Sequence, residues 1–411
     1  MGILTRGARH RSKLAKSTGP LRVNFRRLII RLLTIALIAF VSKWIWDTGE
    51  LRILGNVNAD RCVRLAANRR GFEDIARFSD GSLLSFSSDH HHFKFELGKS
   101  MREMIATKST DVAAYVIAPA SSTPSPVTLK GLPSEFFPHG IHGRGAPSQG
   151  STASTAIAVN HKSNVDAIEV FDLASSTDEG WTLTHKKSIS HSLLFNINDC
   201  ALTPAADAFY CTNWRSQKTG TFRDMAEVYL RMPWTNVVRC EVTLGSCKEV
   251  ASGLKMANGI QISDDGRFVF VVESLRPSIT VFTVENGGML TLSHRIRTRE
   301  SCDNLEWDGN DLLSGCHPRA LTWVRYTKDV EKRQSPCTVL RIVNAAKKRD
   351  HFTRVDFQDA VGNVVSGCSA AAIKGDFLFI GAVHDRGLVR CRRVAVDEKE
   401  NGEVGDSERE L

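Results

Sequence analysis

The sequence predicts an all-β fold, a six-bladed β-propeller preceded by an N-terminal hydrophobic anchor helix. Three observations lead to this fold class. Residues 62–393 show almost no long helical periodicity, and turn pairs such as Asp-Gly, Lys-Gly and Asn-Gly separate their short apolar runs. Six similar units follow one another in this region. One apolar segment before it is nearly long enough to span a bilayer core.

The chain starts with a strongly basic segment. Residues 1–31 contain nine Lys and Arg residues and no acidic residue, whereas the whole chain has 54 basic and 45 acidic residues. The rest of the chain is therefore neutral. Because the positive charge belongs to one short arm, the body is not predicted to bind nucleic acid. A content of 42% apolar and 24% charged residues also excludes disordered and fibrous classes.

The apolar segment, LIIRLLTIALIAFVSKWIW, covers residues 28–46. As a helix it would extend about 28 Å, close to the thickness of a bilayer core. A cleaved signal peptide and a buried core helix are the alternatives to an uncleaved signal anchor. The segment lacks a small-x-small cleavage site before Trp44, and the nine cations among residues 1–31 disfavour a buried helix, so the anchor fits better.

The positive-inside rule then orients the chain as a single-pass membrane protein. It keeps the N-terminus cytosolic and places the propeller in the lumen of the secretory pathway or outside the cell. The end of the chain, Asp397–Leu411, has seven acidic and two basic residues, which is typical of a disordered tail. We expect five segments: a basic cytosolic arm (1–27), the anchor (28–46), a stem (47–60), the propeller (61–393) and the acidic tail (394–411).

The repeated unit is clearest at Asn258–Ile296, which reads as four strands in about 40 residues, the size of one propeller blade. In a propeller, the innermost strands line the central channel, so the openings of the units converge near its axis. The units begin at Glu73, Pro138, Asn198, Asn258, Asp303 and Ser366.

The openings of these units are rich in oxygen donors. Eight polar side chains fall there: Glu73, Asp74, His139, Asn198, Asp199, Asn258, Asp303 and Asn304. Seven of them are carboxylates or amides. Such ligands suit Ca²⁺, whereas Zn²⁺ prefers His or Cys and Mg²⁺ keeps several waters. An isolated Asp or Asn more simply satisfies turn amides. Here, however, four units carry carboxylates or amides and a fifth carries His139 in the same phase, so we favour calcium.

Other chemistry finds little support in the sequence. The ten cysteines contain no CxxC pair, which disfavours a zinc ribbon or a thioredoxin-like site. A lumenal location permits disulfides, but spacing alone does not give their connectivity; Cys240 and Cys247, which flank a short turn, are one candidate pair. No G-x-S-x-G elbow, H-E-x-x-H or phosphate-binding glycine loop occurs, so serine hydrolases, zinc proteases and nucleotide enzymes are disfavoured.

Five motifs together resemble the paraoxonase/arylesterase family, and they run in the family order between about Cys62 and Cys391. They are FPHGI at Phe137–Ile141, AVNH at Ala158–His161, LLFNIND at Leu193–Asp199, ANGIQISDDG at Ala257–Gly266, and DNLEWDG with GCHP within Asp303–Pro318. The resemblance implies a six-bladed propeller with two calcium ions in its channel, and calcium-dependent hydrolysis of lactones and aryl esters.

Residue by residue, the resemblance implies a catalytic calcium ion with five oxygen ligands: Glu73, Asn198, Asn258, Asp303 and Asn304. It implies a second, structural calcium ion at Asp74, Asp199 and the backbone carbonyl of Ile141. It also implies a catalytic pair, His139 and His161, and a free cysteine, Cys316, beside His317. A family disulfide would join Cys62 to Cys391, where it would close the seam of the ring and add roughly 5 kcal/mol in the chain-entropy model.

Two features depart from the family pattern. The loop Ser87–His92 carries three adjacent histidines, which favour a solvated loop over a metal site because adjacent side chains rarely converge on one ion. Met256 stands where the family commonly has an aromatic residue. Both differences lie near the expected substrate pocket, so the natural lactone or ester is not determined by the resemblance.

The predicted function is a membrane-anchored, calcium-dependent hydrolase of lactones and aryl esters. Calcium would polarise the carbonyl group, and His139, tuned by His161, would activate the attacking water. A non-catalytic lumenal chaperone or scaffold of the same family is one alternative, and a gluconolactonase-type propeller hydrolase with one metal ion is another. The retained ligand set favours an enzyme over a non-catalytic scaffold. The single-metal hydrolase is disfavoured by two residue pairs, Asp74/Asp199 and Cys62/Cys391.

Overall fold

The computed structural model describes residues 25–88, 96–105, 111–147, 154–176, 180–216 and 220–393. Most of the basic arm (1–24), the three-histidine loop (His90 to His92) and the acidic tail (394–411) lie outside these ranges. The chain divides into two units, Met1–Ile45 and Trp46–Leu411, which we describe separately.

The described residues of the first unit belong to the helix α1 (Phe25–Asp47), which contains the predicted apolar segment. It runs for 23 residues, and none of its side chains is buried. Its most apolar window has a mean hydropathy of 2.1 and at most two charged residues. By length and composition, α1 is therefore able to cross a membrane, because 23 residues of helix extend about 35 Å.

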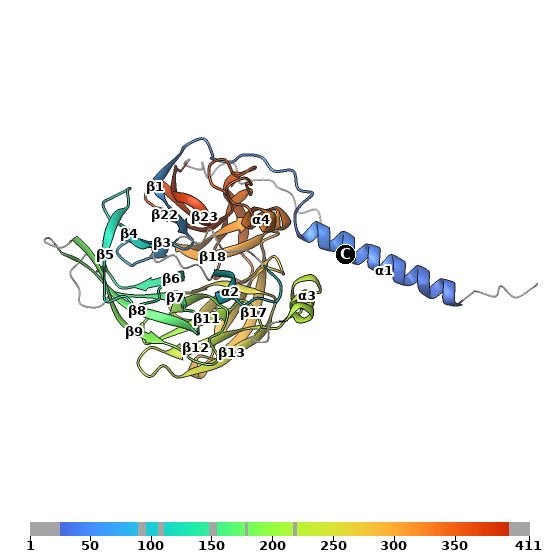
Figure 1. The fold of residues 1–411 in the computed structure, drawn as a ribbon, viewed down its shortest axis with the longest axis horizontal. Helices are drawn as coiled ribbons and strands as arrows, with labels where there is room; N and C mark the ends of the chain where they lie inside the picture. Colours follow the sequence, from blue (N-terminus) through green and yellow to red (C-terminus); the bar gives the residue numbers. More distant parts are fainter. Residues whose placement is uncertain are drawn as a thin grey trace, which may run out of the picture. The chain divides into compact units, whose positions relative to one another are not determined.

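The second unit is built almost entirely of antiparallel strands in a propeller-like arrangement (Figure 1). The first two predicted repeats share an eight-stranded sheet with the order β2-β3-β4-β5-β9-β8-β7-β6. Its strands are β2 (Ala76–Arg77), β3 (Leu83–Ser88), β4 (Val112–Ile117), β5 (Ser125–Lys130), β6 (Pro138–Arg144), β7 (Thr155–His161), β8 (Asp166–Ser176) and β9 (Gly180–Ile189). All its neighbouring strands pair antiparallel except β5 and β9, which run parallel.

Three four-stranded meanders follow along the chain. The first contains β10 (Ile197–Leu202), β11 (Ala208–Asn213), β12 (Thr235–Glu241) and β13 (Cys247–Leu254). The second contains β14 (Ala257–Ile262), β15 (Phe268–Glu273), β16 (Ser278–Val284) and β17 (Leu290–Arg297). The third contains β18 (Ser301–Asp308), β19 (Asp311–His317), β20 (Cys337–Val343) and β21 (Phe352–Asp359).

The last sheet joins both ends of the second unit. It has the order β1-β23-β22, in which β1 is Cys62–Phe72, β22 is Cys368–Lys374 and β23 is Phe377–Arg392. Figure 1 shows the blue β1 beside the red β22 and β23. The described strands thus form five sheets rather than six separate blades, because the β5–β9 pairing merges the first two repeats.

Short helices, which the sequence did not predict, interrupt the strands. They are α2 (Met101–Ile105), α3 (Thr221–Tyr229), α4 (Ala320–Thr327) and the 3₁₀ turn η3 (Asn286–Gly288). All four lie in connections between strands. Each has nine residues or fewer, too short for a 3.6-residue periodicity to stand out in the sequence.

The hydrophobic core fills the spaces between successive groups of strands. One cluster, for example, packs Phe270 of β15 and Val281 of β16 against Leu305 of β18. The Phe270 ring meets Trp307 edge-on, with centroids 5.3 Å apart. Each buried side chain of this size contributes about 1.5–3 kcal/mol to folding. The innermost strands are in contact in chain order, from β2 through β6, β10, β14 and β18 to β22, so their openings meet.

Five disulfides pair all ten cysteines: Cys62–Cys391, Cys200–Cys211, Cys240–Cys247, Cys302–Cys316 and Cys337–Cys368. The first is the pair that the resemblance implied, and the third is the local candidate. The expectation of a free Cys316 is wrong. Cys302 lies directly opposite it in the β18–β19 ladder, with the two Cα atoms 3.9 Å apart, so the two thiols can bond.

The seam disulfide leads to a prediction on stability. Replacing Cys62 and Cys391 together by Ala should lower the free energy of unfolding by up to about 5 kcal/mol, because the bond closes a loop with a sequence separation of 329. Removing Cys240–Cys247, with a separation of 7, should cost about half as much. Chemical denaturation of both double variants measures the difference, and equal losses would contradict the loop-closure explanation.

Candidate functional site

The innermost strands share a β-bulge at the same position. In five of them, one extra residue interrupts the pairing with the next strand: between Pro138 and Ile141, Ile197 and Cys200, Ala257 and Ile260, Cys302 and Leu305, and Cys368 and Ala370. The bulges contain most of the predicted site residues: His139, Asn198, Asp199, Asn258, Asp303 and Asn304. A bulge turns side chains away from the regular alternation, and bulges are common beside active sites.

The two remaining acidic residues of the set, Glu73 and Asp74, lie between β1 and β2. The amide of Asn304 donates to Oε1 of Glu73 at 2.7 Å and to the Glu73 carbonyl at 3.2 Å. His139 Nε2 lies 3.4 Å from the same Oε1. The structure therefore brings residues from three distant parts of the sequence to one point.

The site leaves buried oxygen atoms without hydrogen-bond partners. Four of the five residues predicted to bind the catalytic calcium ion each have one such atom: Glu73 Oε2, Asn198 Oδ1, Asn258 Oδ1 and Asn304 Oδ1. All four side chains are at most 7% exposed. An unsatisfied buried polar atom costs about 1–3 kcal/mol, so a positively charged partner would stabilise this concentration of oxygen donors.

In the described part of the chain, the carboxylates at this point have histidine neighbours but no Lys or Arg partner. Glu73, Asp74, Asp199 and Asp303 are all buried, and no Lys or Arg among the described residues forms an ion pair with them. Burial, followed by repulsion from Asp74, raises the pKa of Glu73 well above its usual value. Burial likewise raises the pKa of Asp74 to about 7. A divalent cation would offset both the burial and the repulsion.

The residues predicted for the second calcium ion are also together, but their carboxylates have partners. Asp74 accepts from the backbone N–H groups of Ile75 and Ile141, both at 2.8 Å. Asp199 accepts from those of Cys200 at 2.7 Å and Ile260 at 2.9 Å. Each carboxylate thus links its own loop or strand to another innermost strand. This set therefore presents satisfied oxygens, in contrast to the four unsatisfied ones.

The histidine pair belongs to a longer hydrogen-bonded chain. His139 Nδ1 lies 3.3 Å from His161 Nε2, and His161 Nδ1 lies 2.9 Å from Asp166 Oδ1. An ionised carboxylate only accepts hydrogen bonds, so Asp166 fixes the proton of His161 on Nδ1. His161 Nε2 then accepts from His139 Nδ1–H, and the other ring nitrogen of His139, Nε2, lies 3.4 Å from Glu73 Oε1.

The sequence reasoning missed Asp166. The residue stands five positions after His161 and pairs with it across the β7–β8 hairpin. Its side chain is 1% exposed, and Arg102 Nε is 4.0 Å away. The available signal was an acidic residue just after a candidate catalytic histidine in a predicted strand–turn–strand segment.

A second contact that was not predicted involves Asp303 and His317. His317 Nε2 is 3.4 Å from Asp303 Oδ2, and the His317 ring stacks on Trp323 of α4 with centroids 4.7 Å apart. Trp323 packs with an apolar cluster, in which Phe137 and Met256 stand two residues before His139 and Asn258. The other members are Met104, Trp214, Val228 and Leu275. Met256, which departs from the family pattern, is buried in this cluster. The arrangement supplies an apolar wall beside the polar centre.

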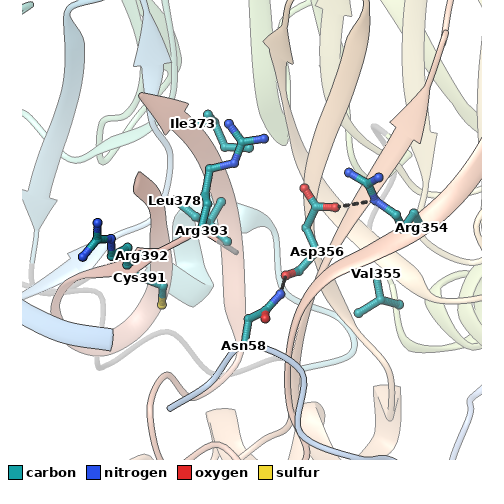
Figure 2. Close-up of a pocket in the computed structure, with 9 residues that line it drawn as sticks. All are labelled: Asn58, Arg354, Val355, Asp356, Ile373, Leu378, Cys391, Arg392 and Arg393. Atoms are coloured by element: carbon teal, nitrogen blue, oxygen red, sulfur yellow. Dashed lines mark hydrogen bonds and ion pairs between the residues drawn. The ribbon is translucent and has the colours of Figure 1, made fainter. Parts of the chain in front are cut away.

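A cavity of about 70 Å³ lies elsewhere, at the seam between β21 and the last sheet (Figure 2). Figure 2 shows Arg354 paired with Asp356, whose carbonyl accepts from Asn58. None of the predicted site residues lines it. Because ligand pockets usually measure about 300–1,000 Å³, this cavity is not the candidate substrate site.

The described residues contain no group of three or more His, Cys, Asp or Glu side chains placed to hold a metal ion. The predicted site of the catalytic ion differs from a group of this kind, because three of its five ligands are asparagines. The amide oxygens are nevertheless suitable for Ca²⁺, which binds carboxylate and amide oxygens together.

Comparison with known proteins gives a consistent set of relatives. The family model described as arylesterase matches residues 129–392. The chain is 31% identical over 255 residues to serum paraoxonase/arylesterase 2 of Bos taurus, covering 62% of this chain and 68% of that protein. It is 30% identical over 258 residues to serum paraoxonase/arylesterase 1 of Homo sapiens, with the same coverage.

Solved structures are similar at a lower level. The luciferin-regenerating enzyme matches with a TM-score of 0.46 and 9% identity, covering 83% of this chain and 96% of that one. A calcium-binding protein, regucalcin of Agrobacterium tumefaciens, matches with a TM-score of 0.42 and 13% identity, covering 82% and 93%.

The close packing of the bulges can be tested at Gly140. A Cβ atom at this position would lie 2.4 Å from Oδ1 of Asp199 and 2.7 Å from the carbonyl oxygen of Asn198. We expect Gly140→Ala to lower the free energy of unfolding by roughly 1–3 kcal/mol, because neither neighbour can move freely. The control is Gly55→Ala, where no atom lies within 4 Å of the added Cβ. Similar denaturation midpoints for the two variants would show that the bulges have room to adjust.

Proposed function

The chain belongs to the arylesterase family, and we propose that it is a membrane-anchored, calcium-dependent hydrolase of lactones and aryl esters. The observation that carries this proposal is the set of four buried, unsatisfied oxygens beside a carboxylate–histidine–histidine chain. The substrate is a small molecule with a lactone or aryl ester carbonyl.

The five residues proposed to hold the catalytic calcium ion supply suitable oxygen donors, and their buried charges and unsatisfied oxygens would be stabilised by a cation. They are Glu73, Asn198, Asn258, Asp303 and Asn304, which supply two carboxylates and three amides. Oxygen donors of mixed charge suit Ca²⁺. The unsatisfied oxygens and the uncompensated carboxylates both favour a cation there. We also propose a second, structural ion at Asp74, Asp199 and the Ile141 carbonyl; the proximity of these groups supports it, although their carboxylates already accept backbone hydrogen bonds.

When bound at this site, calcium supplies the positive charge that polarises a carbonyl group and stabilises negative charge on its oxygen. The protein's own residues supply the proton acceptor. His139 Nε2 carries the lone pair and lies next to Glu73, a proposed ligand, so it can accept a proton from a water molecule that attacks the carbonyl carbon. The apolar cluster beside Trp323 would bind the apolar part of the substrate.

The rest of the hydrogen-bonded chain supports His139 in this role. As His139 takes up a proton on Nε2, positive charge develops on its ring. His161 Nε2, which accepts from His139 Nδ1, stabilises that charge, and Asp166 holds the His161 ring in the required tautomer and orientation. His161 and Asp166 therefore act through His139.

We propose that the second unit is a six-bladed propeller, with β2–β5 and β6–β9 as separate blades. Six apolar clusters support this count, because each packs between two successive groups of strands. The segment boundaries predicted from the sequence (1–27, 28–46, 47–60, 61–393 and 394–411) remain part of the proposal.

We further propose that α1 anchors the chain, with the N-terminus in the cytosol and the propeller in the lumen or outside the cell. Nine basic residues in the first 31 support this orientation. Five disulfides support an oxidising compartment for the propeller, because disulfides rarely persist in the cytosol.

Calcium dependence gives the first test. The full chain in detergent should hydrolyse aliphatic lactones and phenyl acetate with CaCl₂, and EGTA should reduce the rate at least about 100-fold. At 100 times its Kd, calcium should also stabilise the fold by about 2.7 kcal/mol, visible as a higher melting temperature. Asn258→Ala should weaken calcium binding about tenfold or more, whereas Asn310→Ala, at an exposed turn, should not. A folded, calcium-loaded protein without turnover would favour a scaffold function.

The role of His139 gives a separate test. His139→Gln should lower kcat for lactone hydrolysis by at least about 100-fold, because glutamine cannot accept the proton, while calcium affinity stays unchanged. His351→Gln, in the turn before β21, is the matched control. Full activity of His139→Gln would refute the assignment of the base and leave the calcium site untouched.

A further inference from the structure

We propose that the disulfides Cys200–Cys211 and Cys302–Cys316 are positioning elements of the calcium site, because they fix the two bulges that present most of its ligands. This inference rests on the proposed calcium site. It concerns the cysteines themselves, which are not expected to touch calcium or substrate.

Both disulfides lie at the edge of a bulge. Cys302 directly precedes Asp303 and Asn304, and Cys200 directly follows Asn198 and Asp199. Each cysteine bonds to the residue directly opposite on the neighbouring strand, with Cα atoms 3.9 Å apart for Cys302–Cys316 and 4.1 Å for Cys200–Cys211. Cys302–Cys316 is thus the last regular pair before the β18 bulge, and Cys200–Cys211 is the first regular pair after the β10 bulge. Both pairs are linked covalently.

A bulge needs such support because it interrupts the backbone ladder. The extra residue has no partner, and a shift of the pairing by one residue would turn every following side chain to the other face of the sheet. A covalent bond at the edge of the bulge prevents this shift. In β19, the same bond also holds Cys316 next to His317, whose Nε2 is 3.4 Å from Asp303 Oδ2. The Cys302–Cys316 bond therefore fixes both sides of that contact.

The other ligand-bearing bulges are held in a different way. The bulges of β6 and β14 contain Gly140 and Gly259 and have no flanking cysteine. An added Cβ would lie 2.4 Å from Asp199 Oδ1 at Gly140 and 2.4 Å from the Asp303 carbonyl oxygen at Gly259, so these two bulges pack directly on neighbouring strands. Among the ligand-bearing bulges, those of β10 and β18 contain no glycine, carry two oxygen ligands each, and are the ones flanked by cysteines. The β22 bulge is also flanked by a cysteine, Cys368, but it carries no proposed ligand.

The chain provides a matched control disulfide. Cys240–Cys247 joins β12 and β13, the two outer strands of the sheet that begins with β10. Its sequence separation is 7, against 11 for Cys200–Cys211 and 14 for Cys302–Cys316. The three loops are of similar length, so their loss removes similar loop-closure entropy. Only two of the three bonds adjoin a ligand-bearing bulge.

The experiment compares three double variants of the full chain: Cys302→Ala/Cys316→Ala, Cys200→Ala/Cys211→Ala and the control Cys240→Ala/Cys247→Ala. Calorimetric titration with CaCl₂ should show calcium binding at least about tenfold weaker in the first two variants and little changed in the control. Amide hydrogen exchange in EGTA should be faster in residues 301–317 of the first variant and in residues 197–213 of the second, and unchanged there in the control.

Each outcome decides between the hypotheses. Wild-type calcium affinity and wild-type exchange in the first two variants would overturn the positioning role. If the wild-type protein bound no calcium, the proposed function would fail, while the exchange data would still test whether the disulfides fix the bulges. Val/Val replacements, which fill the buried space better, serve where an Ala/Ala variant does not fold. If both types of replacement unfolded the chain, the bonds would be general stabilisers and the proposal would be wrong.

Discussion

The burial of several oxygen donors at one point is the constraint on which the rest of this structure depends. Carboxylates and amides from distant segments meet where the innermost strands begin, and four of their oxygens have no hydrogen-bond partner. Without a cation, such a centre is costly, because buried carboxylates repel one another and burial disfavours their charge. The raised pKa of Glu73, caused first by burial, expresses this cost.

The scaffold meets this constraint with repeated local devices. One extra residue in each of five innermost strands turns the polar side chains toward the centre. Every proposed oxygen ligand on these strands has a close-packed glycine in its bulge or a disulfide-bonded cysteine next to it. The Asp74 and Asp199 carboxylates then accept N–H groups of other innermost strands. The polar centre and the packing around it are therefore built by the same residues, so a change at one affects the other.

The site combines a polar centre with an adjoining apolar cluster. The chain from Asp166 through His161 to His139 ends at Glu73, whereas Trp323 and its cluster lie beside His317. This combination suits the hydrolysis that we propose, because an ester or lactone needs a polarised carbonyl, a proton acceptor and a binding surface for its apolar part.

The sequence by itself determined the all-β character, the spacing of the repeated units, the apolar N-terminal segment and the oxygen-rich chemistry of the strand openings. These properties are local: turn residues, short apolar runs and the residue types at one position of each unit are readable without knowing what they contact. The resemblance to a family added the expected roles of His139 and His161. Only the tertiary structure decided that Asp166 orients His161, that Cys316 bonds to Cys302, and that β5 pairs with β9. Each of these contacts depends on which residues lie opposite each other on paired strands. The pairing register shifts by one residue at every bulge, and the spacing of residues in the sequence does not show where these shifts occur.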